Sequence, residues 1–352
     1  LINVAPDVQN VMIKSVIALL RHTNAYTGVP YAADPALAFI EMQNEDDVFF
    51  FSTTEHAVNA CPTYREDLLR RYSGWLQEKY GTQAALESAW GPLAFNRYSR
   101  RGEQLERANI DVVLNGWFMG PKGLQQGRET GTYRRLLDNA QFLHSLQTTY
   151  YGGFETALRA VGYVGPLIGS CWQGSGGITH FYNLHADYAV GLIDRHNYFG
   201  GMGGYAPRTG AFNNDSQLRQ PGGGLLSSGL QQVRDRPFAL SEWASVFPNM
   251  WAAESPVLIA AYGLGLQGWD ASYAFASSAS GRRYHGWASA LQHATGLWLV
   301  DVPHHIGLYP ALARMIYRGD VREGALIAAR RVALEQLRTD SLDFSEEVRQ
   351  EG

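Results

Sequence analysis

The sequence predicts an α/β fold with a parallel sheet, and three observations support this. Short apolar runs alternate with longer segments of helical periodicity, as in chains that cross back over a parallel sheet. Each apolar run is followed by polar and aromatic residues, which is typical of strand ends that meet at one edge of a sheet. The length of 352 residues is enough to bury a large core.

Helical periodicity recurs along the chain. Residues 7–21 place Val8, Val11 and Met12 on one face and follow Pro6, a helix start signal. The same reasoning predicts helices at residues 64–81, 83–91, 132–162, 183–189 and 248–265.

Five apolar runs are expected to form the buried strands. Each is followed or closed by residues able to do chemistry, in the order NE, CW, DRHNY, SEW and GWD. The runs lie at residues 36–43, 163–172, 189–199, 236–245 and 261–275.

Composition excludes several classes of protein. The 29 basic residues are outnumbered by 33 acidic ones, so the basic surplus of a phosphate-binding nucleic-acid protein is missing. No run approaches the ~18 apolar residues of a membrane span. Cys61 and Cys171 are too few for a disulfide framework or a four-sulfur zinc site. We expect no metal and no cofactor.

Two carboxylates stand out, because Glu45 and Glu242 each follow an apolar strand. A single glutamate at a strand end is usually solvated or ion-paired. Two of them on different strands, both flanked by groups that can bind sugar, favour glycoside hydrolysis. In that reaction one carboxyl group is the acid and base while the other attacks the anomeric carbon.

The motifs around these glutamates resemble clan A of the retaining glycoside hydrolases, which are (β/α)8 TIM barrels. Asn44-Glu45 is similar to the pair that closes the fourth strand of that clan, and Glu242 in ALSEW to the nucleophile of the seventh. Residues 24–45 resemble family 5, and residues 75–91 resemble the family 42 β-galactosidases. The resemblance implies that Glu45 is the acid/base and Glu242 the nucleophile.

The resemblance also implies a set of substrate-binding residues. His196 and Tyr198 look like the sixth-strand pair whose tyrosine keeps the nucleophile ionised. From its position two residues before His196, Asp194 is expected to orient the histidine. Asn44 would bind the sugar 2-hydroxyl. Trp269 is similar to the tryptophan that forms the floor of the subsite for the reacting sugar. Apart from the resemblance, we expect Trp172 and Trp243 to stack on sugar rings, because flat apolar C–H faces of sugars pack on aromatic rings.

Counting strands from this match gives the expected domain organisation. Residues 1–319 would form the barrel from strand 4 to strand 8, with an insertion at about 46–162. The first three strands would come from an absent N-terminal segment or another chain. Residues 320–352 would be a C-terminal extension, the start of a further module.

The expected function is a retaining glycoside hydrolase that cleaves β-linked sugars of oligo- or polysaccharides by double displacement. A non-catalytic carbohydrate-binding barrel, or an inactive fragment of such an enzyme, is the alternative. The sugar, the linkage, and exo or endo action stay open. Localisation is also open, and secretion or a periplasmic location is favoured if the substrate is a polysaccharide.

Overall fold

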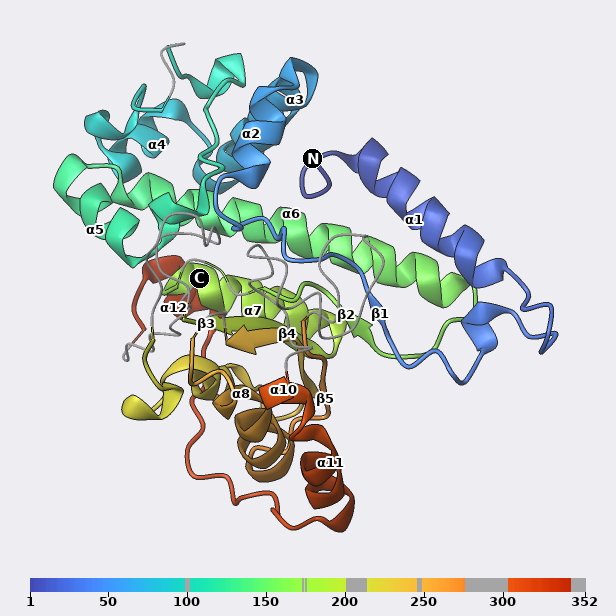
Figure 1. The fold of residues 1–352 in the computed structure, drawn as a ribbon. Helices are drawn as coiled ribbons and strands as arrows, with labels where there is room; N and C mark the ends of the chain where they lie inside the picture. Colours follow the sequence, from blue (N-terminus) through green and yellow to red (C-terminus); the bar gives the residue numbers. More distant parts are fainter. Residues whose placement is uncertain are drawn as a thin grey trace. The chain divides into compact units, whose positions relative to one another are not determined.

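The structure is a computed structural model that describes residues 1–98, 102–172, 174, 176–200, 214–245, 249–275 and 303–342. The chain divides into two compact units (Figure 1). The first consists of Leu1–Gly191 with Arg331–Ser345, and the second of Leu192–Arg330 with Glu346–Gly352.

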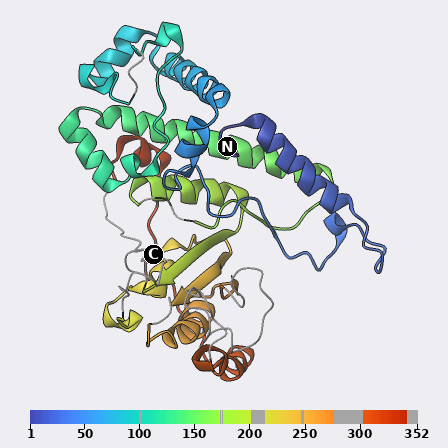
Figure 2. The ribbon, with the colours of Figure 1, turned by 45° about the horizontal axis from the view of Figure 1, so that its top comes forward.

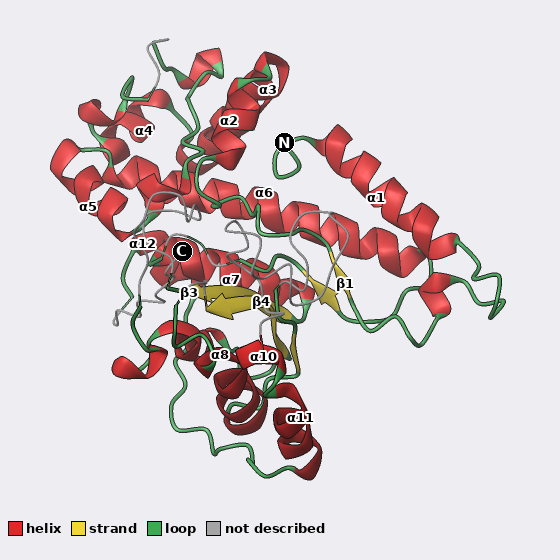
Figure 3. Cartoon of the chain, viewed as in Figure 1, coloured by secondary structure: helices red, strands yellow, loops and turns green. Residues whose placement is uncertain are grey.

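Helices make up most of the first unit (Figure 3). Its helices are α1 (Pro6–Arg21), α2 (Thr53–Asn59), α3 (Pro62–Tyr80), α4 (Gln83–Trp90), α5 (Pro121–Thr130), α6 (Tyr133–Ala160), α7 (Ile178–Val190) and α12 (Leu334–Thr339). Two short strands, β1 (Ile40–Glu41) and β2 (Leu167–Ile168), pair in parallel.

Local signals set the ends of these helices. α3 begins with a proline in its first turn, where no N–H is needed, and ends at Gly81, whose φ of 77° favours glycine. At the start of α4, the Thr82 hydroxyl accepts a hydrogen bond from the Ala85 N–H at 3.1 Å. Within the part of the chain that the structure describes, no helix is long and apolar enough to cross a membrane.

The long helix α6 organises the core of the first unit. It contacts α1, α4, α5, α7 and α12, and many of its side chains are buried. The fully buried Arg135 pairs with Glu103 through two hydrogen bonds of 2.6 and 2.8 Å, so a charge inside the core is matched.

The second unit contains a three-stranded parallel sheet in the order β3-β4-β5. Figure 2 shows the two longest strands side by side. The sheet consists of β3 (Ile193–Phe199), β4 (Phe238–Ser245) and β5 (Ala271–Ser272). The helices described in this unit are α8 (Glu254–Val257), α10 (Pro303–Ile306) and α11 (Tyr309–Arg318), together with a π-helical segment, Leu258–Leu266.

A β-bulge interrupts the pairing of β3 with β4. Arg195 pairs with Leu240, but the next residue, His196, pairs with Glu242. Ser241 is therefore an extra residue on β4, and the pairing after it is shifted by one position.

The coarse prediction of an α/β fold with parallel strands is confirmed, because the strand pairs of both sheets are parallel. A closed barrel is not found in the described residues. β1, β2 and β5 are each only two residues long, shorter than predicted. The strand expected at 261–275 is largely wrong, because Leu258–Leu266 is helical.

The segment 46–162, expected as an insertion, contains α2 to α6 of the first unit, and α12 from the expected extension packs on α6 and α7.

Candidate active site

Glu242 owes its position to the bulge on β4. In a regular ladder Ser241 would pair with His196, and Glu242 would pair with Asn197. Successive side chains of a strand point to opposite faces, so Glu242 would then share the face of Asn197. The register shift instead places Glu242 on the face that carries His196 and Tyr198.

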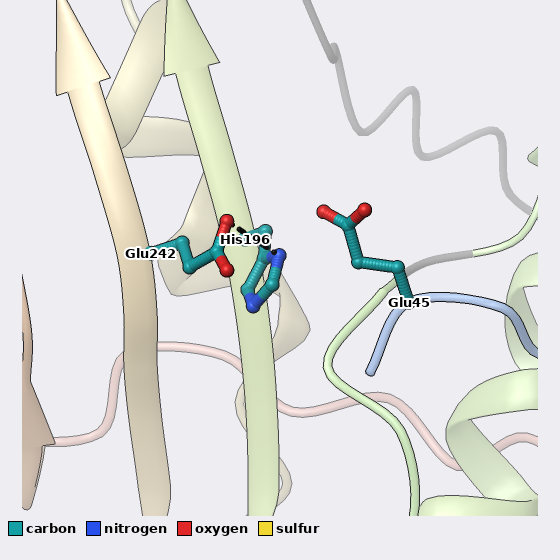
Figure 4. Close-up of side chains that lie close together, drawn as sticks. All are labelled: Glu45, His196 and Glu242. Carbon is teal, nitrogen blue, oxygen red and sulfur yellow. Dashed lines mark ion pairs between the residues drawn. The ribbon is translucent and has the colours of Figure 1, made fainter. Parts of the chain in front are cut away.

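The carboxylate of Glu242 is bound by two side chains of the neighbouring strand. The Tyr198 hydroxyl donates a hydrogen bond to Oε2 at 2.5 Å. The Nδ1 atom of His196 lies 3.3 Å from the same oxygen, as the dashed line in Figure 4 marks. His196 is 1% exposed and Glu242 19% exposed. A partly accessible carboxylate with its charge stabilised from one side is suited to nucleophilic attack.

Ser241 and Asp194 form hydrogen bonds that hold the His196 ring in place. The hydroxyl of Ser241 lies 3.0 Å from Nε2 of His196, so both ring nitrogens have a partner on β4. The Asp194 carboxylate accepts a hydrogen bond from the Ser241 N–H at 2.9 Å. Asp194, predicted to orient His196, therefore acts on it through the bulge residue.

Two of the predicted tryptophans do not join Glu242. Trp243 pairs with Asn197, so it faces the other side of the sheet, and it is buried. Trp269 precedes β5 and packs on Phe238, the first residue of β4, with ring centroids 5.2 Å apart. It therefore lies at the first residue of β4, four residues before Glu242, where it is buried in the core.

Glu45 lies in the first unit, four residues after the end of β1. Figure 4 draws its side chain. Its backbone is left-handed, with a φ of 48°, which a residue with a side chain adopts only when the surroundings impose it. The Glu45 N–H donates to Sγ of Cys171 at 3.2 Å. The Cys171 thiol in turn donates to the Asn44 side-chain oxygen at 3.3 Å. One buried thiol thus contacts both residues of the Asn44-Glu45 pair.

The acidic residues around Glu45 differ in their surroundings. Partial burial, and then the neighbouring Glu45 carboxylate, raise the pKa of Asp46. Asp47 is buried, and its side chain accepts a hydrogen bond from the Phe49 N–H at 2.5 Å, which fixes the turn. Glu41, the last residue of β1, is exposed and does not point into a core.

Trp172 follows Cys171 and is the centre of an aromatic group. Its ring packs edge-on against Phe50 at 5.2 Å and tilted against Phe51 at 6.0 Å. Only 7% of Trp172 is exposed.

The predicted residues therefore form one group in each unit. Glu242, His196 and Tyr198 meet on β3 and β4, while Glu45, Asn44 and Trp172 gather after β1 and β2. Sequence reasoning missed the roles of Ser241 and Cys171. Their only signal was position, because each stands beside a predicted site residue at or after a strand.

Comparisons with known proteins find no match for this chain, whether with family models, with curated proteins or with solved structures.

Proposed function

We propose that the protein is a retaining glycoside hydrolase related to clan A, with Glu242 as the nucleophile and Glu45 as the acid/base. The proposed architecture is the (β/α)8 barrel of that clan. The proposed substrates are β-linked oligo- or polysaccharides.

The contacts of Glu242 carry the proposal. A tyrosine hydroxyl that donates to a carboxylate favours its charged form, and an ionised carboxylate is what attacks an anomeric carbon. The donor comes from the adjacent parallel strand, and a β-bulge places the carboxylate beside it. Bulges of this kind re-aim side chains next to active sites.

In the proposed reaction, an oxygen of Glu242 forms a bond to the anomeric carbon as the glycosidic bond breaks. Glu45 gives its proton to the leaving oxygen. A water molecule that loses its proton to Glu45 then attacks the same carbon, and the Glu242–sugar bond breaks. Two inversions retain the configuration, and the reaction requires carboxyl groups about 5–5.5 Å apart.

Covalent trapping tests this assignment. The full chain is incubated with a panel of activated 2-fluoro-β-glycosides (glucoside, galactoside, mannoside and xyloside), and the protein is analysed by intact mass and peptide mapping. We expect a single sugar adduct on Glu242. The product configuration, followed by NMR with the matching aryl glycosides, should be retained.

A matched pair of variants sharpens the experiment. Glu242→Gln should form no adduct, whereas Asp235→Asn, the same change at an exposed carboxylate of the second unit, should form it as the parent does. An adduct on another carboxylate, or an inverted product, would overturn the assignment. Sugar binding without turnover would favour the non-catalytic alternative.

A further inference from the structure

The aromatic group around Trp172 extends to the surface of the first unit. Phe51 lies between two tryptophans, 6.0 Å from the Trp172 ring and 5.3 Å from the Trp117 ring, and Phe50 packs on both Phe51 and Trp172. Exposure rises along the series, from 7% at Trp172 to 56% at Trp117. We call Phe50, Phe51, Trp117 and Trp172 the aromatic platform.

The platform is held rigidly at its outer end. Gly116 donates a backbone hydrogen bond to the Phe51 carbonyl at 3.0 Å. A side chain at Gly116 would collide with the Phe49 carbonyl, so only glycine permits this close approach. Gly116 also begins the 3₁₀-helix η4 (Gly116–Met119), and the Asn115 side chain accepts a hydrogen bond from the Trp117 N–H at 3.1 Å. Trp117 is thus presented by a fixed turn.

Phe51 provides independent evidence that this shape is imposed. Its φ of 42° is left-handed, an unfavourable conformation for a bulky residue. Glu45, six positions earlier, is also left-handed. Such residues cluster at ligand-binding positions, where the surrounding structure over-determines them.

The chemistry at the outer end is that of a sugar subsite. Trp117 offers a flat apolar face. The Asn115 side chain, which accepts from the Trp117 N–H, lies 3.4 Å from the Glu55 carboxylate, and these two polar groups can donate to and accept from hydroxyl groups. A sugar ring presents the matching pair of apolar C–H faces and hydroxyl edges. At its inner end the platform adjoins Cys171, which contacts Asn44, the proposed ligand of the sugar 2-hydroxyl.

We infer that the aromatic platform is an extended subsite for a neutral oligosaccharide, whose outer unit stacks on Trp117. This inference rests on the proposed function, and it means that the substrate has several sugar units. The occupant is a carbohydrate rather than a protein, because the rings continue inward to the candidate sugar site and polar groups flank the outer ring.

Binding measurements separate this inference from catalysis. The full chain with Glu242→Gln is titrated calorimetrically with cello-, manno-, xylo- and galacto-oligosaccharides of one to six units. Affinity should rise with length in at least one series. Adding Trp117→Ala should weaken binding of the longer members by about tenfold, with a loss that grows with length, while Trp117→Phe should keep most of the affinity.

Tyr26→Ala is the control, since Tyr26 is 99% exposed and lies outside the platform. It should bind like the parent, and circular dichroism should show that the variants are folded. The inference is overturned if no oligosaccharide binds the parent, or if Trp117→Ala binds every probe as the parent does. It is also overturned if the substitution changes only the oligomeric state. Length-dependent binding without turnover by the unmutated chain would refute the hydrolase and leave the platform standing.

Discussion

The two candidate carboxylates are positioned by different means. At Glu242 the neighbouring strand contacts the carboxylate itself, through the Tyr198 hydroxyl and the His196 ring. At Glu45 the contacts that set its position act on the backbone, through the thiol of Cys171 and a left-handed turn. The contacts named here therefore reach the charged group of Glu242 and the main chain of Glu45.

This difference corresponds to the two roles that we propose. A nucleophile has to stay ionised, so donors held against its carboxylate assist it. An acid/base has to gain and lose a proton in each cycle, and the Cys171 contact holds the main chain of Glu45 rather than the carboxyl group that would carry this proton. The comparison predicts that substitutions in the two regions will have different kinetic signatures.

The largest difference is expected for the two glutamates themselves. Glu45→Ala should lower turnover of substrates with poor leaving groups by roughly 10³-fold, because these need a proton on the departing oxygen. Activated aryl glycosides do not need this proton, so the first step should slow far less with them. Azide, which can attack without a general base, should restore turnover and give a glycosyl azide as the product. Glu242→Gln should lose turnover of both kinds of substrate to the same extent. Steady-state rates across a leaving-group series measure this, and equal losses in both variants would break the comparison.

A smaller effect is expected for Tyr198→Phe. The change removes a hydrogen bond to a charged group, so kcat/KM should fall roughly 10- to 100-fold. A control is Tyr273→Phe, because Tyr273 is a half-exposed tyrosine of the same unit. An unchanged kcat/KM for Tyr198→Phe would show that this contact only stabilises the fold.

A smaller effect again is expected at Cys171. Cys171→Ala removes the acceptor of the Glu45 N–H and the donor to Asn44, so turnover should fall about tenfold, mainly with poor leaving groups. Cys171→Ser keeps both hydrogen-bonding functions and should recover most of the rate. Cys61→Ser, the same change at the other cysteine, should behave as the parent. If alanine and serine act alike, Cys171 does not position Glu45.

The smallest effect is expected from acid acting on the histidines His144 of α6 and His185 of α7, and it concerns stability and not rate. Burial, and then the neighbouring His185, lower the pKa of His144 from 6.5 to about 3. Between those values the unfolded chain binds a proton that the folded chain does not, so stability falls as pH drops from about 6.5 towards 3. From pH 7 to pH 5 the free energy of unfolding should drop by about 2 kcal/mol through this group.

Urea unfolding at both pH values measures this loss, and His144→Phe should reduce it. The helix α7 that carries His185 also carries Asp187, which accepts a hydrogen bond from the Ser170 N–H next to Cys171. Acid should therefore loosen the Glu45 region through α7. A pH dependence identical in the variant and the parent would contradict this.

The helices were the part of the fold most open to prediction. α1 was expected at 7–21 and occupies Pro6–Arg21, and α6 was expected at 132–162 and occupies Tyr133–Ala160, because apolar periodicity and start signals are local. The strand predicted at residues 261–275 was largely wrong because that segment has no such local signal. A continuously apolar segment has no period, so a buried strand and a buried helix look alike, and the chain forms a π-helix there.

For the site, residue types could be predicted but not their faces. Glu242, His196 and Tyr198 were identified from motifs, and they do meet. Trp243 shared the motif of Glu242 and points to the other side of the sheet, since pairing across strands decides this. The bulge and the contacts of Cys171 depend on residues far apart in the chain, which local patterns do not record.

The bulge has a consequence for how β4 can vary in length. Ser241 takes up one residue, so the residues before it and those after it are paired independently with β3. A relative that lacked this residue could keep Leu240 opposite Arg195 and Glu242 opposite His196 in an unbroken ladder. It would lose only the hydroxyl beside His196 and the N–H that Asp194 binds. A related sequence with one residue fewer at this position would therefore have a simplified site and not an abolished one.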